Sequence, residues 1–134
     1  MISDIKIPEV KNVTLAVARQ KNAASGDEWK VYLINSNDFV IENTLVASKG
    51  YGEKDGEPQR TSILRHFLDS IAPNSATLIE PIDSTLFHLN NEYWVSYYVG
   101  SQIFDKRFVF VPESIQEENL SFIKELEMEG VLHS

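Results

Sequence analysis

Apolar and polar residues alternate at period two through much of this chain, and turn-forming residues cut the alternation into short runs. Four runs have the β-branched and aromatic composition typical of strands: residues 13–18, 28–34, 39–48 and 76–82. Clusters of Asn, Asp, Gly, Pro and Ser separate them, as at residues 22–27, 35–38 and 50–58. The pattern predicts a mostly β fold.

The clearest local signal is the segment 91–111, in which two alternating runs flank Gly100 and Ser101. A type II′ hairpin turn needs a positive φ at its first central residue, and glycine adopts this conformation without strain. Such a turn fixes the strand register and places Tyr97 opposite Phe104. We expect this pair on the core face of the hairpin.

The other face of the same hairpin is semi-polar and carries Trp94, Tyr98, Ile103 and Arg107. The register places Trp94 opposite Arg107, and a guanidinium stacked on an exposed indole would contribute about 0.5 to 1 kcal/mol. Aromatic residues and arginine are enriched at the hot spots of protein interfaces. These four residues are therefore the predicted interaction site, for a protein partner or for a second copy of the chain.

Residues 113–130 have the boundary signals of a helix. Ser114 and Glu117 have the spacing of a capping box, and Gly130 occupies a suitable C-terminal position. An apolar stripe would lie along this helix: Ile115, Phe122, Ile123 and Leu126. A helix with such a stripe must bury it, and the favoured interpretation is that it covers the Trp94 side of the hairpin. The alternative leaves that side open for a partner.

The segment 60–71 is ambiguous, because its apolar residues fit a helix over 62–71 as well as a blurred strand. We favour a strand, since hairpins surround the segment. In either conformation Arg65 and His66 point in different directions, so they do not converge on one substrate by local geometry.

Together these elements predict an antiparallel, Ig-like β-sandwich of about seven strands with one C-terminal helix. The alternative is an α+β fold with a second helix at 62–71. One domain is expected over 1–134, with an N-terminal extension at 1–11, a β body at 12–111 and the helix at 113–130.

Charge and composition argue against several function classes. The net charge is −8, and six glutamates from Glu113 onward are opposed only by Lys124. No cluster of basic residues predicts nucleic-acid binding, and no long apolar run predicts a membrane span. The sequence contains no cysteine, which fits a reducing compartment, so we expect a cytoplasmic protein.

No residue pattern predicts catalysis, a cofactor or a metal site. The three histidines, at positions 66, 88 and 133, lack the spacing of metal-binding motifs. The glycine-rich segment 49–57 contains acidic residues that would repel a phosphate, so it is interpreted as a mobile hairpin loop.

Six segments carry a resemblance to a known family: LVASKGYGE, RTSILRHFLDSIAP, LIEPI, NNEYWVSYYV, FDKRFVFVPESI and GVLH. Together they resemble a family of short bacterial proteins over nearly the whole chain. Some members of this family are labelled phenylalanyl-tRNA synthetase subunit beta. This chain is too short and too acidic for that subunit's aminoacylation machinery, so the resemblance implies no functional residue.

Two function classes follow. The first is a small non-catalytic protein that acts through protein–protein contacts or self-association. The second, implied by the family label alone, is an accessory factor or enzyme related to phenylalanyl-tRNA synthetase. A pocket that gathers Arg60, Arg65, His66 and Glu80 would favour this second class.

Overall fold

The computed structural model describes residues 8–22, 24 and 26–134, and most of these belong to antiparallel β-strands. The mostly β class predicted from the alternation is therefore confirmed. Short 3-10 helices, η2 (Ser84–Leu86) and η3 (Glu117–Asn119), lie in connections. The described residues form ten strands: β1 (Val13–Gln20), β2 (Glu28–Asn35), β3 (Ile41–Lys54), β4 (Glu57–Arg60), β5 (Leu64–Ile71), β6 (Ser75–Pro81), β7 (Asn90–Val99), β8 (Gln102–Phe110), β9 (Ser121–Ile123) and β10 (Met128–His133).

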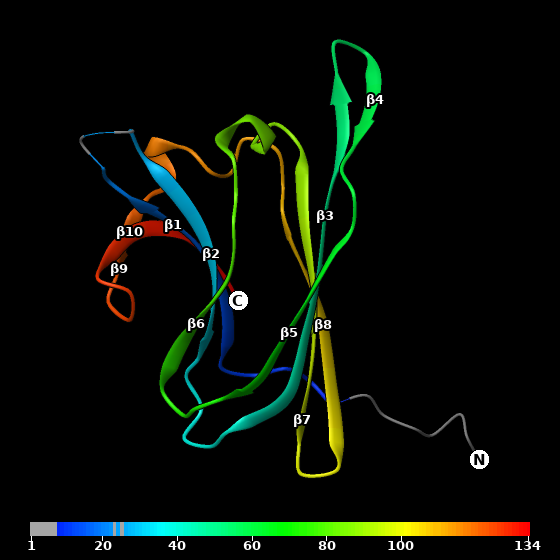
Figure 1. Ribbon diagram of the computed structural model, residues 1–134, viewed down its shortest axis with the longest axis vertical. Helices are drawn as coiled ribbons and strands as arrows, with labels where there is room; N and C mark the ends of the chain where they lie inside the picture. Colours follow the sequence, from blue (N-terminus) through cyan, green and yellow to red (C-terminus); the bar gives the residue numbers. More distant parts are fainter. Residues whose placement is uncertain (1–7, 23, 25) are drawn as a thin grey trace.

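The strands form two antiparallel sheets that face each other (Figure 1). Sheet A has the order β6-β2-β1-β10-β9, and sheet B has the order β4-β3-β7-β8. In sheet B, β5 also pairs with β3, along Ile41–Ser48, while β4 pairs with the later stretch Tyr51–Lys54. The long strand β3 therefore pairs with β5 and β4 along one edge and with β7 along the other.

The hydrophobic core lies between the two sheets and draws on alternate residues of each. Val17 and Leu33 contribute from sheet A, and Tyr93, Val95 and Phe108 contribute from sheet B. All five are almost fully buried. Because side chains alternate along a strand, the residues between the buried ones on β7 must point away from sheet A.

The predicted hairpin is confirmed in turn and in register. Gly100 has a φ of 60°, as the first central residue of a type II′ turn requires. Tyr97 pairs with Phe104, and their rings are stacked with centroids 5.2 Å apart. Burial raises the pKa of the Tyr97 hydroxyl to about 12.

The Tyr97–Phe104 stack is expected to show energetic coupling beyond simple burial. A double-mutant cycle with Tyr97→Ala and Phe104→Ala should give a coupling of about 1 kcal/mol in urea unfolding, because stacked aromatic pairs contribute about that much beyond their buried area. A control cycle pairs Phe104→Ala with Phe122→Ala on sheet A and should be additive. Equal coupling in both cycles would contradict a specific stack.

The segment 64–71 is the strand β5, so the favoured reading is confirmed and the alternative helix at 62–71 is wrong. The strand pairs with β3, and Arg65 lies opposite Ala47 while His66 lies opposite Val46. These neighbours therefore point to opposite faces of sheet B, as expected for a strand.

The segment 49–57 is not a loop, which corrects the sequence interpretation. β3 continues to Lys54, and β4 starts at Glu57. The connecting residues Asp55 and Gly56 both have positive φ, at 53° and 80°, which is the pattern of a tight type I′ hairpin turn. The β3–β4 hairpin extends beyond the other strands (Figure 1).

The predicted C-terminal helix at 113–130 is wrong, because this part of the chain completes sheet A. It contains η3 and β9, and β10 begins at Met128 and pairs with β1. The expected capping residue Ser114 instead donates its hydroxyl to the carbonyl of Val111, at 2.6 Å. β4, β9 and β10 are the strands beyond those expected from the sequence.

Gly130 explains part of this difference. It belongs to β10 and pairs with Ala18 of β1, rather than ending a helix. A Cβ atom at this position would lie only 2.5 Å from the backbone oxygen of Val17. The glycine is therefore required by the close approach of two strands, not by a left-handed helix terminus.

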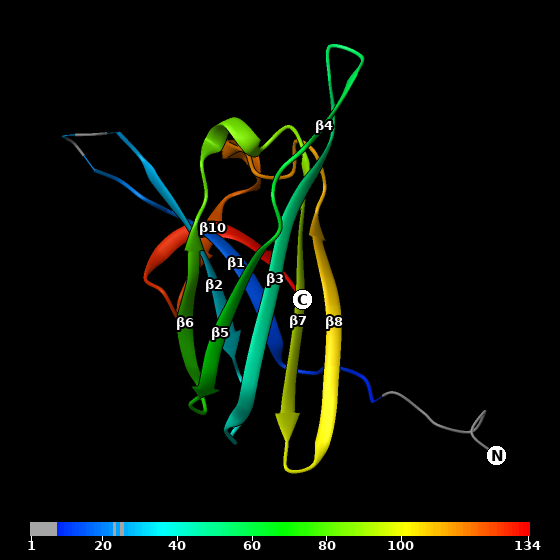
Figure 2. The same ribbon diagram turned by 45° about the vertical axis from the view of Figure 1, so that its right-hand side comes forward.

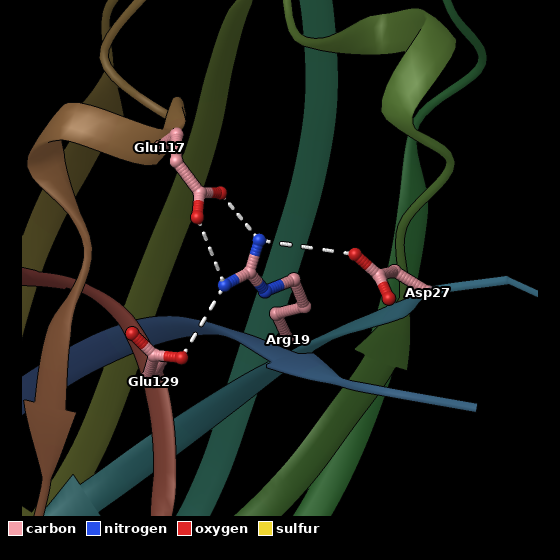
Figure 3. A network of polar contacts seen from close by, with 4 residues as sticks. All are labelled: Arg19, Asp27, Glu117 and Glu129. Carbon is pink, nitrogen blue, oxygen red and sulfur yellow. Dashed lines mark hydrogen bonds and ion pairs between the residues drawn. The ribbon is translucent and has the colours of Figure 1, made fainter. Parts of the chain in front are cut away.

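A buried arginine ties the C-terminal segment to β1 (Figure 3). Arg19 donates hydrogen bonds from Nη1 to Glu117 at 2.5 Å and from Nη2 to Glu129 at 3.3 Å. The Asp27 carboxylate forms an ion pair with Nη1 at 3.8 Å. The hydrogen bond from Arg19 holds the pKa of Glu117 below its ordinary value. The network therefore fixes η3 and β10 against the end of β1.

The Glu117–Arg19 contact is expected to make stability depend on pH. Because the folded pKa of Glu117 is lowered, its contribution is complete above the ordinary pKa of 4.5 and is lost as the pH falls through the lowered value. Glu117→Gln should therefore lower the Tm at neutral pH, and the difference from wild type should shrink as the pH falls below 4.5. Glu118→Gln is the matched control, and an equal loss there would contradict the assignment.

Candidate interaction surface

The outer face of sheet B carries four rows of side chains that align across its strands, and we call this surface the Trp94 face. It points away from sheet A, because Tyr93, Val95 and Tyr97 on the opposite side of β7 are buried in the core. In order along β7, the rows are Lys49, Glu92 and Val109; Arg65, Ala47, Trp94 and Arg107; Phe67, Leu45, Ser96 and Asp105; and Glu42, Tyr98 and Ile103.

The centre of the Trp94 face is apolar and open. Leu45, Phe67, Trp94, Tyr98 and Ile103 each leave more than a third of their surface accessible. Residues 113–130, predicted as a helix that covers this face, instead contain η3, β9 and the start of β10. Both strands belong to sheet A. Figure 2 turns sheet B toward the viewer, with β5, β3, β7 and β8 across its face.

One end of the Trp94 face holds a buried carboxylate. Glu92 is only 4% exposed although it points outward. The Tyr51 hydroxyl donates to it at 3.2 Å, and Lys49 Nζ and Arg107 Nε lie at 3.6 and 3.9 Å. Burial and then the hydrogen bond to Glu92 raise the pKa of Tyr51. These contacts position two cationic side chains beside Trp94.

The four residues predicted as an interaction site do lie together. Trp94 faces Arg107 and Tyr98 faces Ile103 in the β7–β8 register. The expected stacking of Arg107 on the indole is not among the cation–π contacts of the described residues, since the guanidinium lies beside Glu92 instead. The pairing was therefore predicted correctly, but the stack was not.

Sequence reasoning missed Leu45 and Phe67, which extend the apolar surface across β3 and β5. They pair with each other, and Leu45 also pairs with Ser96 of β7. Both occupy alternating positions on their own strands, and that alternation was the available signal. Their place beside Trp94 follows from the β3–β7 pairing, which no local pattern specifies.

A second polar cluster lies between the sheets, where β5 approaches β6. Glu80 accepts hydrogen bonds from Ser48 at 2.8 Å and from Tyr93 at 3.3 Å, and His66 Nε2 is 2.6 Å from the same carboxylate. Burial, reinforced by Glu80, raises the pKa of Tyr93. A cavity of about 190 Å³ adjoins the cluster, and Ser48, Glu80 and Tyr93 line it.

This cluster lacks the Ser–His contact of a hydrolase triad. Ser48 donates its hydroxyl to the Glu80 carboxylate, and His66 contacts that carboxylate instead of Ser48. Arg65 lies on the opposite face of sheet B, and Arg60 lies on β4 opposite Tyr51. A cluster of Arg60, Arg65, His66 and Glu80 would favour synthetase-related chemistry. Of these four residues, only His66 and Glu80 lie together.

Within residues 8–22, 24 and 26–134, no group of three or more His, Asp or Glu side chains is arranged to hold a metal ion. No helix in this described part is long and apolar enough to span a membrane.

Comparisons of the chain with family models, with curated proteins and with solved structures find no match. The resemblance to the bacterial family is therefore not tested by them.

Proposed function

We propose that this chain is a small non-catalytic protein that acts through protein–protein association, with the Trp94 face as its binding surface. The observation that carries the proposal is the open apolar centre of that face, bordered by charged residues. A scaffold of Ig-like general shape would hold the surface rigid. The proposed compartment is the cytoplasm, since a chain without cysteine needs no oxidising environment.

The size of the apolar surface supports this proposal. Phe67, Trp94 and Tyr98 are 61%, 48% and 37% exposed. At about 200 Å² per aromatic side chain, their open surface amounts to roughly 300 Å². Leu45 and Ile103 enlarge it further. The largest apolar patch on a typical soluble monomer measures about 300 to 600 Å² and is often functional.

The composition of the face also fits a protein partner better than a nucleic acid or a membrane surface. Tryptophan, tyrosine and arginine are the residue types that dominate binding hot spots. The basic side chains are accompanied by acidic ones in neighbouring rows, so the face offers no uniform positive charge for phosphates. No observation favours a role related to phenylalanyl-tRNA synthetase.

Trp94→Ala tests the proposal. We expect it to weaken association, with another protein or with a second copy, by about 30-fold, because a central tryptophan typically contributes about 2 kcal/mol or more. Phe122→Ala is the control, since Phe122 is exposed on sheet A. The proposal fails if the wild-type protein stays monomeric at high concentration and Trp94→Ala changes no association in a cell extract.

A further inference from the structure

We propose, building on the function above, that the occupant of the Trp94 face is a second copy of this chain. The two sheets B would pack face to face in antiparallel orientation. The two-fold axis would lie in the interface, perpendicular to β7, and pass midway between the rows of Trp94 and Ser96. The same surface then serves both copies, as a two-fold interface requires.

The distribution of charge on the Trp94 face fits this arrangement. Its four rows hold three basic and three acidic residues, although the whole chain has a net charge of −8. The first two rows hold the three basic residues and Glu92, a net charge of +2, and the last two rows hold Asp105 and Glu42, a net charge of −2. An antiparallel partner places the net positive half of the face on the net negative half, whereas a parallel partner would place halves of like net charge on each other.

The proposed axis also gives individual charges their partners. A two-fold rotation about an axis perpendicular to the strands places each strand over the same strand of the partner. It also reverses the order of the rows. Arg107 of β8 then meets the partner's Asp105. Lys49 of β3 meets the partner's Glu42 by the same operation. Each contact occurs twice in the dimer.

The sizes of the apolar side chains agree with the same axis. Trp94 would lie over the partner's Ser96, and Leu45 would lie over the partner's Ala47, so that large residues meet small ones. Arg65 would lie over the partner's Phe67, a favourable cation–π pairing. Aligned sheets pack about 10 Å apart with strand directions within about 30°. An angle of this size displaces side chains least next to the two-fold axis, so the rows of Trp94 and Ser96 keep the partners given above.

Charge exchange within β8 tests this arrangement by sedimentation equilibrium of the full chain. Asp105→Arg should weaken the wild-type dimer at least about tenfold, because two basic side chains then face two basic side chains. Arg107→Asp should weaken it similarly, because acidic side chains face each other. An equimolar mixture of the two variants should form a heterodimer about as stable as the wild-type dimer, since both contacts are again attractive.

The restored heterodimer distinguishes repulsion from misfolding, since misfolded variants would not recover on mixing. A wild-type dimer that these variants do not weaken, or weakened variants that do not associate on mixing, would overturn the antiparallel arrangement. A monomeric wild-type protein that binds a different protein through Trp94 would overturn self-association and leave the proposed function intact. A monomer without any Trp94-dependent association would overturn both.

Discussion

Phe108→Ala is expected to lower the free energy of unfolding by about 4 kcal/mol, because it empties the centre of the core. Phe108 is fully buried and lies opposite Tyr93 in the β7–β8 register. The ring of His133 meets it edge-on, with centroids 5.4 Å apart. Phe108 thus joins sheet B to the last strand of sheet A.

Phe122→Ala is the matched control, with the same substitution on a residue that is 68% exposed. It should change the free energy of unfolding by less than about 1 kcal/mol in urea titrations at one protein concentration. Similar losses for both variants would contradict the location of the core between the sheets.

Gly130→Ala is expected to cost about 3 kcal/mol or more, although it adds only one methyl group. The new Cβ would lie 2.5 Å from the Val17 oxygen and 2.7 Å from the side chain of Ile123. The β1 backbone cannot move away without breaking its pairing with β2 on the other side. Overpacking at a fixed backbone therefore becomes strain.

Thermal unfolding of Gly130→Ala should show a clear fall in Tm, of roughly 10 °C or more. Leu132→Ala, two residues along β10 and about half exposed, is the control and should have a small effect. If Gly130→Ala is as stable as wild type, β10 does not approach β1 as described.

The parts of the fold that were predictable depend on short-range signals. Gly100 requires a positive φ, and this one constraint fixed the register that places Tyr97 on Phe104. The hairpins around residues 60–71 likewise favoured a strand correctly, although the alternation there is blurred, and Arg65 and His66 do point to opposite faces. In both cases the decisive interaction lies within one strand or between adjacent strands.

The C-terminal segment failed because its decisive partner is distant in sequence. Ile115 and Ile123 fit a helical stripe, yet Ile115 belongs to the main core and Ile123 packs with Ala16 and Ile34 of sheet A. The exposed edge of β1 determines where β10 lies, and no local pattern shows that edge. Tertiary pairing therefore overrode the capping signals of Ser114 and Glu117.

The candidate site was predicted in part for the same reason. Trp94, Tyr98, Ile103 and Arg107 all belong to one hairpin, so their shared face followed from its register. Leu45 lies on β3 and joins them through a pairing across the sheet. The apolar surface therefore extends beyond the four residues that were predicted.

The most direct test of the Trp94 face follows the two indole N–H signals in ¹⁵N-correlated NMR spectra. The chain has two tryptophans, and Trp29 packs edge-on against Phe87, with centroids 5.1 Å apart, away from this face. As association proceeds, by concentration or by added partner, the Trp94 signal should shift or broaden while the Trp29 signal stays unchanged. Association that moves the Trp29 signal and leaves the Trp94 signal in place would contradict the account.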